Sequence, residues 1–275
     1  MKNIFSNCYS VEYIDISNFD TSQITDFASL FEGCSRLTSV LLDKFETREV
    51  KDMSAMFNGC YQLKSLNISH FNTSKVTKMD FMFRECNSLT YLDVSNFDTR
   101  NVVDMTYMFQ GCRELTSLYV SNFITKNVRS ISSIFQDCYK LKEINLNNFD
   151  TSNVEEMIRC FQNCYSLTSL ELHTFTTSKV LDMSYMFKNC SGITSLNLDN
   201  FDTSKVTDMT YMFNDCTKLE KLDIRNFDTS STSAYYASGI FENCNSLTIF
   251  INYNKFKNLY SSIPDYVKIV NVSLY

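Results

Sequence analysis

Proline, glycine, histidine and tryptophan are scarce in this chain: its 275 residues include one proline, five glycines, two histidines and no tryptophan. Five glycines leave no glycine-rich loop that could cradle a phosphate group. No apolar run approaches the roughly 18 residues that a membrane-spanning helix needs. A surplus of positive charge is also missing. The net charge of −6 argues against a nucleic-acid backbone or an anionic membrane as the main partner.

A strict internal repeat dominates what is present. Cysteines recur every 26 residues, and a phenylalanine and a threonine recur with the same step. Self-similarity at a period of roughly 20–50 residues is the signature of a solenoid or another array of stacked repeats. The cysteines in register are Cys8, Cys34, Cys60, Cys86, Cys112, Cys138, Cys164, Cys190 and Cys216, with Cys244 two residues late.

Each repeat combines two periodicities, which we number by offset from its cysteine, taken as zero. Offsets 3 to 9, for example residues 89–95, alternate apolar and polar side chains and predict a short strand with one buried face. Offsets 16 to 23, for example residues 102–109, space apolar residues by three and one and predict a short helix. An Asp at offset 18, such as Asp104, would cap that helix. The threonine at offset 13 would satisfy backbone groups of the connecting loop.

The repeat predicts one continuous array of about ten repeats over residues 1–250. Because residues 4 and 5 already occupy offsets 22 and 23, we expect a partial first repeat without the polar cap that usually closes a solenoid. An open end exposes strand backbone, so we also expect self-association through the N-terminal edge. Residues 251–275 lose the pattern and are interpreted as a last strand and cap, with a linker as the alternative.

The chemically reactive side chains form no catalytic or metal-binding constellation. Parallel cysteines on neighbouring rungs would hold their Cβ atoms ~4.8 Å apart, outside the usual ~3.5–4.5 Å of a disulfide, so the column is interpreted as reduced core, with Cys160 replacing a core methionine. His70 and His173 stand four rungs apart, about 19 Å at ~4.8 Å per rung, too far to share a proton or a metal ion. The Asp and Asn residues at offset 12 lack the glycine-rich repeat of calcium-binding β-rolls. We therefore predict no enzyme, no cofactor and no metal.

The spacing L-x-x-L-x-L at offsets 3 to 8, as in Leu167, Leu170 and Leu172, matches the leucine-rich-repeat template. The wider pattern, SLTSL followed by NFDTSKVTDMTYMFNDC, resembles the 26-residue repeat family of bacterial surface proteins related to the BspA-like proteins. Phenylalanine at offset 11 departs from ordinary leucine-rich repeats, which place Asn or Cys there. The resemblance implies an α/β solenoid, a leucine-rich-repeat-like horseshoe with parallel concave strands and short convex helices. It also implies a cell-surface or extracellular role in adhesion or protein binding.

Two functions of different class stay open. The first is a non-enzymatic scaffold that binds a host or cell-surface protein, without nucleic-acid binding or membrane insertion. The second is an intracellular adaptor or structural spacer. Residues 1–15 suit the second function, because they contain no continuous apolar segment of the kind found in a secretory signal.

The candidate binding surface is the outward stripe of the strands. Residues at offset 7 lie between two buried positions, so they form a polar, mildly acidic stripe roughly 40 Å long at ~4.8 Å per rung. Curved solenoids commonly recognise partners with such a surface, and two tyrosines on it resemble interface anchors. The alternatives are a merely solvated face and a competing aromatic row at offset 21, which consists of Phe81, Tyr107, Tyr185 and Tyr211. The proposed ligand-binding residues are Asp15, Asn67, Tyr91, Asp93, Tyr119, Asn145, Glu171, Asn197 and Asp223.

Overall fold

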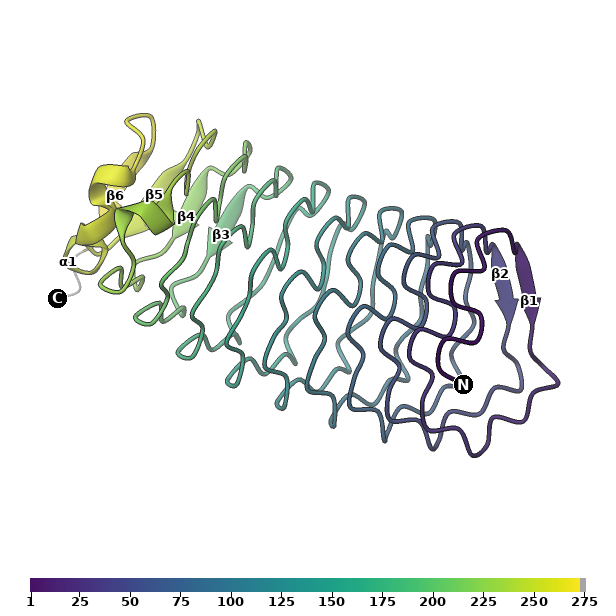
Figure 1. Cartoon of the computed structure of the whole chain (residues 1–275). Coiled ribbons are helices and arrows are strands. Elements are labelled where there is room, and N and C mark those ends of the chain that lie inside the picture. The colour runs from purple at the N-terminus through teal and green to yellow at the C-terminus, as the bar shows by residue number, and fades with distance from the viewer. Residues whose placement is uncertain (273–275) are drawn as a thin grey trace.

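The computed structural model describes residues 1–272 and shows an elongated stack of rungs, in which one repeat makes one rung (Figure 1). The N-terminal repeats form one end of the stack and the C-terminal segment forms the other. Equivalent positions of successive repeats pair in parallel, as Tyr13 does with Ser39. These features confirm the predicted leucine-rich-repeat-like solenoid with parallel strands.

Two short sheets mark the ends of the strand face, which we define as the side formed by offsets 4 to 9. In the first sheet, β1 (Tyr13–Asp15) pairs with β2 (Ser39–Leu41). Between the two sheets, residues 42–194 form one isolated parallel bridge on this face, from Leu118 to Ile144. Backbone pairing is therefore sparser in the middle of the strand face than at its ends. The second sheet consists, in order, of β3 (Ser195–Asn197), β4 (Lys221–Asp223), β5 (Thr248–Ile251) and β6 (Lys268–Asn271).

The core consists of columns of equivalent side chains, one from each rung. At offset 23, the ring centroid of Phe109 lies 5.7 Å from that of Phe83 and 6.0 Å from that of Phe135. The Cys112 thiol donates a hydrogen bond to the Phe83 carbonyl, 3.3 Å away in the preceding rung. Burial raises the pKa of Cys112 to about 12, as expected for an inert structural thiol.

The cysteine prediction is confirmed for most of the column. All eleven cysteines are free, and ten of them are buried, while Cys8 is half-buried at the N-terminal end. Cys160 is completely buried beside the core methionines, as its offset predicted. Each thiol therefore acts as a small core side chain rather than as a cross-link.

The predicted convex helices are wrong for the repeats. Offsets 16 to 25 run instead through successive tight turns, and we call this side of the stack the turn face. Within residues 1–272, helices occur only towards the C-terminal end: η1 (Ala234–Ala237), α1 (Tyr253–Phe256) and η2 (Lys257–Ser262). The repeats therefore stack without a helical layer.

Bonds between rungs replace the bonds that a helix would make within itself. On the turn face, the N–H groups at offsets 19, 21, 23 and 25 donate to carbonyls of the next rung. Phe83, for example, donates to the Met108 carbonyl at 2.9 Å, and Glu85 donates to the Gln110 carbonyl at 2.6 Å. All these donors point towards the C-terminal end of the stack and all the acceptors point towards the N-terminal end.

Left-handed backbone at two positions of each repeat explains the missing helix. Residues at offsets 21 and 25 have φ between +54° and +75°, which a right-handed helix cannot include. Offset 25 usually holds Gly, Asn or Asp, the residues that tolerate this conformation best. Offset 21 adopts it even with Phe81 and Tyr107. The apolar spacing of three and one therefore arises from turns.

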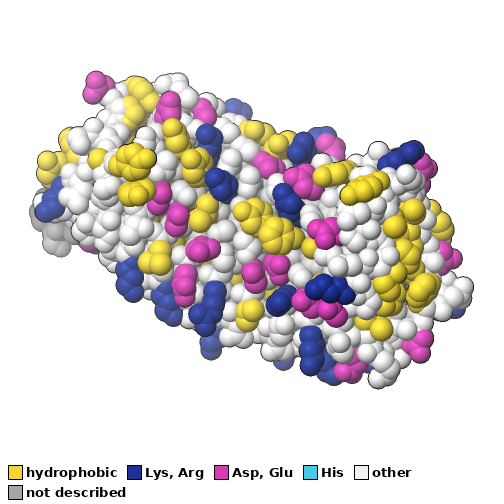
Figure 2. Space-filling view, in the orientation of Figure 1, with side chains coloured by type: hydrophobic (Ala, Val, Ile, Leu, Met, Phe, Trp, Pro, Cys, Tyr) yellow, Lys and Arg dark blue, Asp and Glu magenta, His cyan; other side chains and the backbone are white. Residues whose placement is uncertain are grey.

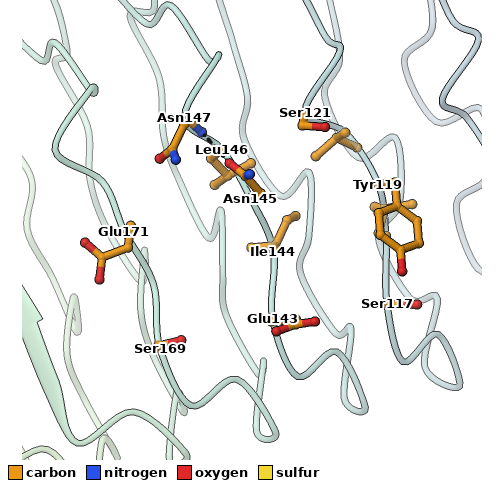
Figure 3. A pocket seen from close by; sticks show the side chains of 12 residues that line it. Ser117, Tyr119, Ser121, Glu143, Ile144, Asn145, Leu146, Asn147, Ser169 and Glu171 are labelled. Carbon is orange, nitrogen blue, oxygen red and sulfur yellow. Dashed lines mark hydrogen bonds between the residues drawn. The ribbon is translucent and has the colours of Figure 1, made fainter.

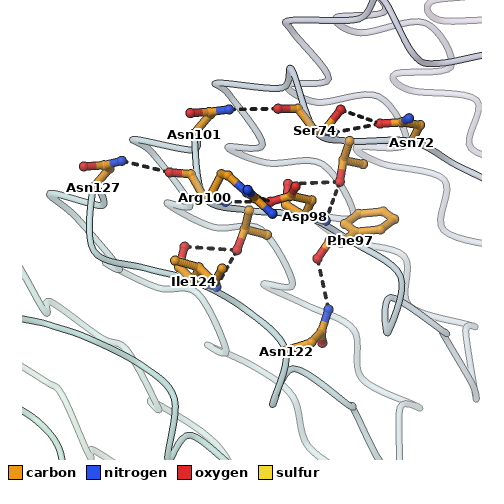
Figure 4. Close-up of polar contacts among 11 residues, drawn as sticks. Asn72, Ser74, Phe97, Asp98, Arg100, Asn101, Asn122, Ile124 and Asn127 are labelled. Atoms are coloured by element: carbon orange, nitrogen blue, oxygen red, sulfur yellow. Dashed lines mark hydrogen bonds and ion pairs between the residues drawn. The ribbon is translucent and has the colours of Figure 1, made fainter.

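The threonine at offset 13 holds the loop between the two faces. The Thr99 hydroxyl donates to the Ile124 carbonyl at 3.1 Å and accepts from the Ile124 N–H at 2.7 Å (Figure 4). Threonine thereby pairs both backbone groups of offset 12 in the next rung, as the sequence predicted. The side chain at offset 12 closes its own loop, because Asn72 accepts from both the N–H and the hydroxyl of Ser74. The polar residues of this loop thus stabilise its turns by hydrogen bonds.

The two ends of the stack expose different groups. At the C-terminal end, the Tyr266 hydroxyl donates to the Phe241 carbonyl and accepts from the Asn243 N–H. At the N-terminal end, the side chains of Ile4 and Phe19 are 53% and 45% exposed, and Figure 2 shows hydrophobic side chains gathered at that end. Self-association through this edge and the domain boundary at residue 250 stay predictions. Residues 273–275 of the predicted cap lie outside the described residues.

Candidate functional site

The strand face presents the side chains that the sequence predicts to bind a ligand. Tyr119 at offset 7 stands between buried Leu118 and Val120, and this alternation repeats along the stack. Seven of the nine predicted residues are exposed, while Asp93 and Asp223 are half-buried. The alternation along the strand face therefore directs the predicted residues to one side of the molecule.

Most polar side chains of the stripe already have a partner within the chain. The Asp93 carboxylate accepts hydrogen bonds from the hydroxyl and the N–H of Ser95, at 2.6 and 2.9 Å, and these bonds lower the pKa of Asp93. Each such side chain closes the turn that follows its strand, a role that the sequence interpretation missed. The residues that accept an N–H bond from two positions ahead are Asp15, Asn67, Asp93, Asn145, Asn197 and Asp223.

Tyr119 and Glu171 are the two predicted offset-7 residues whose side chains make no such bond within the described chain. They stand on either side of the rung that carries Asn145. Among the predicted residues, the stripe therefore changes its chemistry near the middle of the stack, where the side chains of Tyr119 and Glu171 are free to meet a ligand.

A hollow of about 390 Å³ opens at that place (Figure 3). Tyr119, Asn145 and Glu171 line it from three successive rungs, and Ile144 lies between them. The offset-6 side chains on either side, such as Leu118 at 3% exposure, are buried, whereas Ile144 is half-buried. Polar side chains therefore surround the hollow, and the half-buried Ile144 exposes apolar surface between them. Further lining residues are Ser117, Ser121, Glu143, Asn147 and Ser169.

The charges around this hollow are unbalanced. Glu143 and Glu171 are exposed, and no cationic side chain of residues 1–272 lines the hollow. A second hollow of about 300 Å³ lies towards the C-terminal end, where Asp223 forms an ion pair with Arg225 and Lys221 also contributes to the lining. The predicted residues therefore fall into three settings: the acidic first hollow, the second hollow with two cations and one carboxylate, which includes Asn197, and open strand surface. The last group consists of Asp15, Asn67, Tyr91 and Asp93.

The competing aromatic row lies on the turn face and is half-buried. The rings of Tyr185 and Tyr211 lie 5.4 Å apart. The Arg159 guanidinium lies 4.8 Å from the Tyr185 ring, and the Lys188 ammonium lies 4.9 Å from the Tyr211 ring. Because neighbouring rings and cations already contact these aromatic faces, the row is better suited to packing than to recognition. Phe81 and Tyr107, the other two members, stack on each other at 4.9 Å.

Neither a metal centre nor a membrane-spanning helix occurs within residues 1–272. No three His, Cys, Asp or Glu side chains in that range come together in a way that could hold a metal ion. No helix in the same range combines the length and the apolar character that a membrane crossing requires.

Solved structures similar to this chain include leucine-rich-repeat proteins of low sequence identity. One, from Bacteroides ovatus, is 17% identical, with a TM-score of 0.34 over 99% of this chain and 87% of the other. Another, from Leptospira interrogans, is 13% identical, with a TM-score of 0.35 over 79% of this chain and 55% of the other. The plant peptide hormone receptor RGFR1, solved in complex with RGF2, is 13% identical, with a TM-score of 0.30 over 86% of this chain and 43% of the other. No curated protein matches the chain.

A family assignment comes from the sequence itself. Three overlapping segments, residues 1–117, 87–191 and 166–265, each match one family, described as Mycoplasma protein of unknown function, DUF285. Together these segments include the whole repeat array and part of the C-terminal segment. The chain therefore belongs to the DUF285 family.

Proposed function

We propose that this chain is a non-enzymatic protein-binding scaffold that acts in adhesion at the cell surface and engages its partner through the strand face. The observation that carries the proposal is the hollow at the middle of that face, where an exposed tyrosine, a half-buried isoleucine and two carboxylates adjoin, neither carboxylate having an ion-pair partner within residues 1–272. Tyrosine is among the residues that most often dominate binding energy at protein interfaces. The resemblance to BspA-like surface proteins supports the choice of the cell surface.

The two faces have different roles in the stack, and this difference supports the strand face as the binding surface. Turn-face backbone groups are bonded from rung to rung, and the loop threonines bond to the next rung as well. A side chain such as Tyr119, 58% exposed and outside these bonds, can change without loosening the stack. The strand face can therefore carry a specific surface on a constant frame.

Selection from a random peptide library on phage tests the binding function and does not require an identified partner. The folded chain is immobilised, and recovered peptides are measured by calorimetry against two paired variants. Tyr91→Ala with Tyr119→Ala removes strand-face aromatics, and Tyr185→Ala with Tyr211→Ala removes turn-face aromatics. We expect the first pair to weaken binding at least tenfold and the second to leave it within about twofold, once circular dichroism shows that both are folded. Loss with the second pair alone would show that the turn face is the binding surface.

Intact cells that carry the gene test the location. Trypsin added outside the cells should cleave a surface-displayed chain while a cytoplasmic marker protein survives. A chain that becomes sensitive only after lysis would instead support the intracellular adaptor or spacer, and it would leave the binding function to be judged by the peptide experiment.

A further inference from the structure

We infer that the partner segment at the hollow is an extended peptide with one apolar and two basic residues at alternate positions, the apolar residue standing at one end of the three in either chain direction. The inference rests on the proposed function, because it concerns the same face, and it narrows the partner to a class defined by charge and spacing. Three features of the hollow support it: two carboxylates without an ion-pair partner in the described part of the chain, the separation of these carboxylates, and the apolar surface beside them.

The carboxylates at the hollow differ from glutamates that are paired with a lysine elsewhere along the stack. Elsewhere, Glu49 is bonded by Lys75 and Glu114 by Lys140, both at 2.6 Å, with each lysine one rung further on. Glu143 and Glu171, in contrast, adjoin a hollow whose other lining residues are uncharged. A partner that supplies cations would therefore complete a pairing that the chain makes for itself at other rungs. Guanidinium groups suit this role because they bond carboxylates in a bidentate way.

The separation of the two carboxylates fits alternate residues of an extended chain. Glu143 stands at offset 5 of one rung and Glu171 at offset 7 of the next. One rung of ~4.8 Å and two residues of ~3.3 Å place their Cα atoms roughly 8 Å apart. Side chains at positions i and i+2 of an extended peptide point the same way and lie ~6.6 Å apart. Long basic side chains can cover the remaining difference.

The apolar surface begins one rung before Glu143, on the side away from Glu171, and extends to the Glu143 rung itself. Figure 3 shows the Tyr119 ring and Ser117 on the preceding rung, and Ile144 beside Glu143 and Asn145 on the same rung. A peptide that runs along the stack would therefore meet an apolar surface first, then one carboxylate and then the other. Its apolar residue would cover Ile144 and lie against Tyr119, which removes exposed apolar area from water.

Fluorescein-labelled peptides test this order and spacing by anisotropy. The probe is Ser-Leu-Ser-Arg-Ser-Arg-Ser, used with its reversed sequence because the direction of the partner is free. The matched control peptide, Ser-Leu-Arg-Arg-Ser-Ser-Ser, has the same composition but places its two arginines on opposite sides of an extended chain. We expect one of the two probes to bind at least tenfold more tightly than the control at low salt, with Glu143→Gln plus Glu171→Gln removing that advantage. Glu155→Gln plus Glu220→Gln, which removes two exposed carboxylates elsewhere, should leave it unchanged.

Two results would overturn the inference: the probes and the adjacent-arginine control bind equally tightly, or both double variants lose the same amount of affinity. Either result would show that the peptides are attracted only by the overall negative charge. The phage selection separates this failure from failure of the proposed function. Selected peptides that lack basic residues but depend on Tyr119 would overturn the basic-peptide inference and support the strand-face scaffold. Selected peptides that are indifferent to the strand-face tyrosines would overturn both.

Discussion

The turn face and the strand face hold the same rungs together by different means. On the turn face, backbone bonds recur at every rung, from Phe83 to Met108 at 2.9 Å and again from Phe187 to Met212 at 2.9 Å. On the strand face, regular pairing is confined to two short sheets and a single bridge between them. The stack therefore takes its register from the turns, and its strand face is free to vary in sequence and shape.

The largest expected loss comes from the core column behind the turn face. Phe109→Ala removes a fully buried ring that stacks on neighbours in both directions, so we expect it to lower the free energy of unfolding by about 3–5 kcal/mol. Urea unfolding followed by circular dichroism measures the loss. Tyr119→Ala on the strand face is the control and should cost less than about 0.5 kcal/mol. The opposite ranking would show that the strand face carries the stability.

A smaller loss is expected where a loop threonine joins two rungs. Thr99→Val keeps the shape of the side chain but leaves the Ile124 N–H and carbonyl without their hydroxyl partner, which should cost about 1–3 kcal/mol. Thr116→Val, at an exposed strand-face position, is the matched control and should be nearly neutral. Similar unfolding midpoints for both variants would contradict the bridging role.

A conformational test isolates the left-handed backbone of the turn face. Gly59 has φ of +73°, and a Cβ built there meets no atom closer than 3.5 Å, so Gly59→Ala adds strain without a clash. We expect a loss of about 1–2 kcal/mol in urea unfolding. Ser65→Ala, exposed on the strand face a few residues later, should change stability by less than about 0.5 kcal/mol. A stabilising Gly59→Ala would show that this turn can relax to a right-handed conformation.

The smallest effect concerns pH and the loop aspartates. Hydrogen bonds from the hydroxyl and N–H of the following serine lower the pKa of Asp150, Asp202 and Asp228 below the ordinary value of 3.8. The stabilisation is therefore complete above pH 3.8 and is lost as pH falls through the lowered folded values. Urea midpoints of the native chain should fall below about pH 4. Replacing all three aspartates by asparagine, which already occupies position 72 in an equivalent loop, should flatten this fall, and an unchanged pH profile would exclude their contribution.

The columns of the fold could be predicted from the sequence, because the repeat assigns one environment to each offset. Cys112, Phe109 and Leu118 are buried as their offsets predicted. The helix prediction failed because tight turns also space apolar residues by three and one. The residues at offset 25 could have indicated the turns, because Gly59, Gly111 and the Asn and Asp residues at the same offset, just before the cysteines, favour left-handed backbone.

The candidate site was predicted only in part. Alternation sufficed to place Tyr119 and Glu171 on the outward side of the strands. The turn-closing role of Asp93 could have been recognised from Ser95 two residues later, since such pairs are typical of turns. The hollow could not be predicted, because it depends on the three-dimensional packing that leaves Ile144 half-buried while Leu118 is buried.

The constant step between bonded residues has a genetic consequence. The Thr99 hydroxyl reaches position 124, and the Thr73 hydroxyl reaches position 98, in both cases 25 residues ahead. Within residues 8–216, where the step is constant, loss or duplication of one complete repeat would return each core column and each loop threonine to an equivalent partner. Unequal recombination between such similar coding segments can therefore lengthen or shorten the stack by whole rungs in a single event, and each product inherits a folded frame with a different extent of strand face.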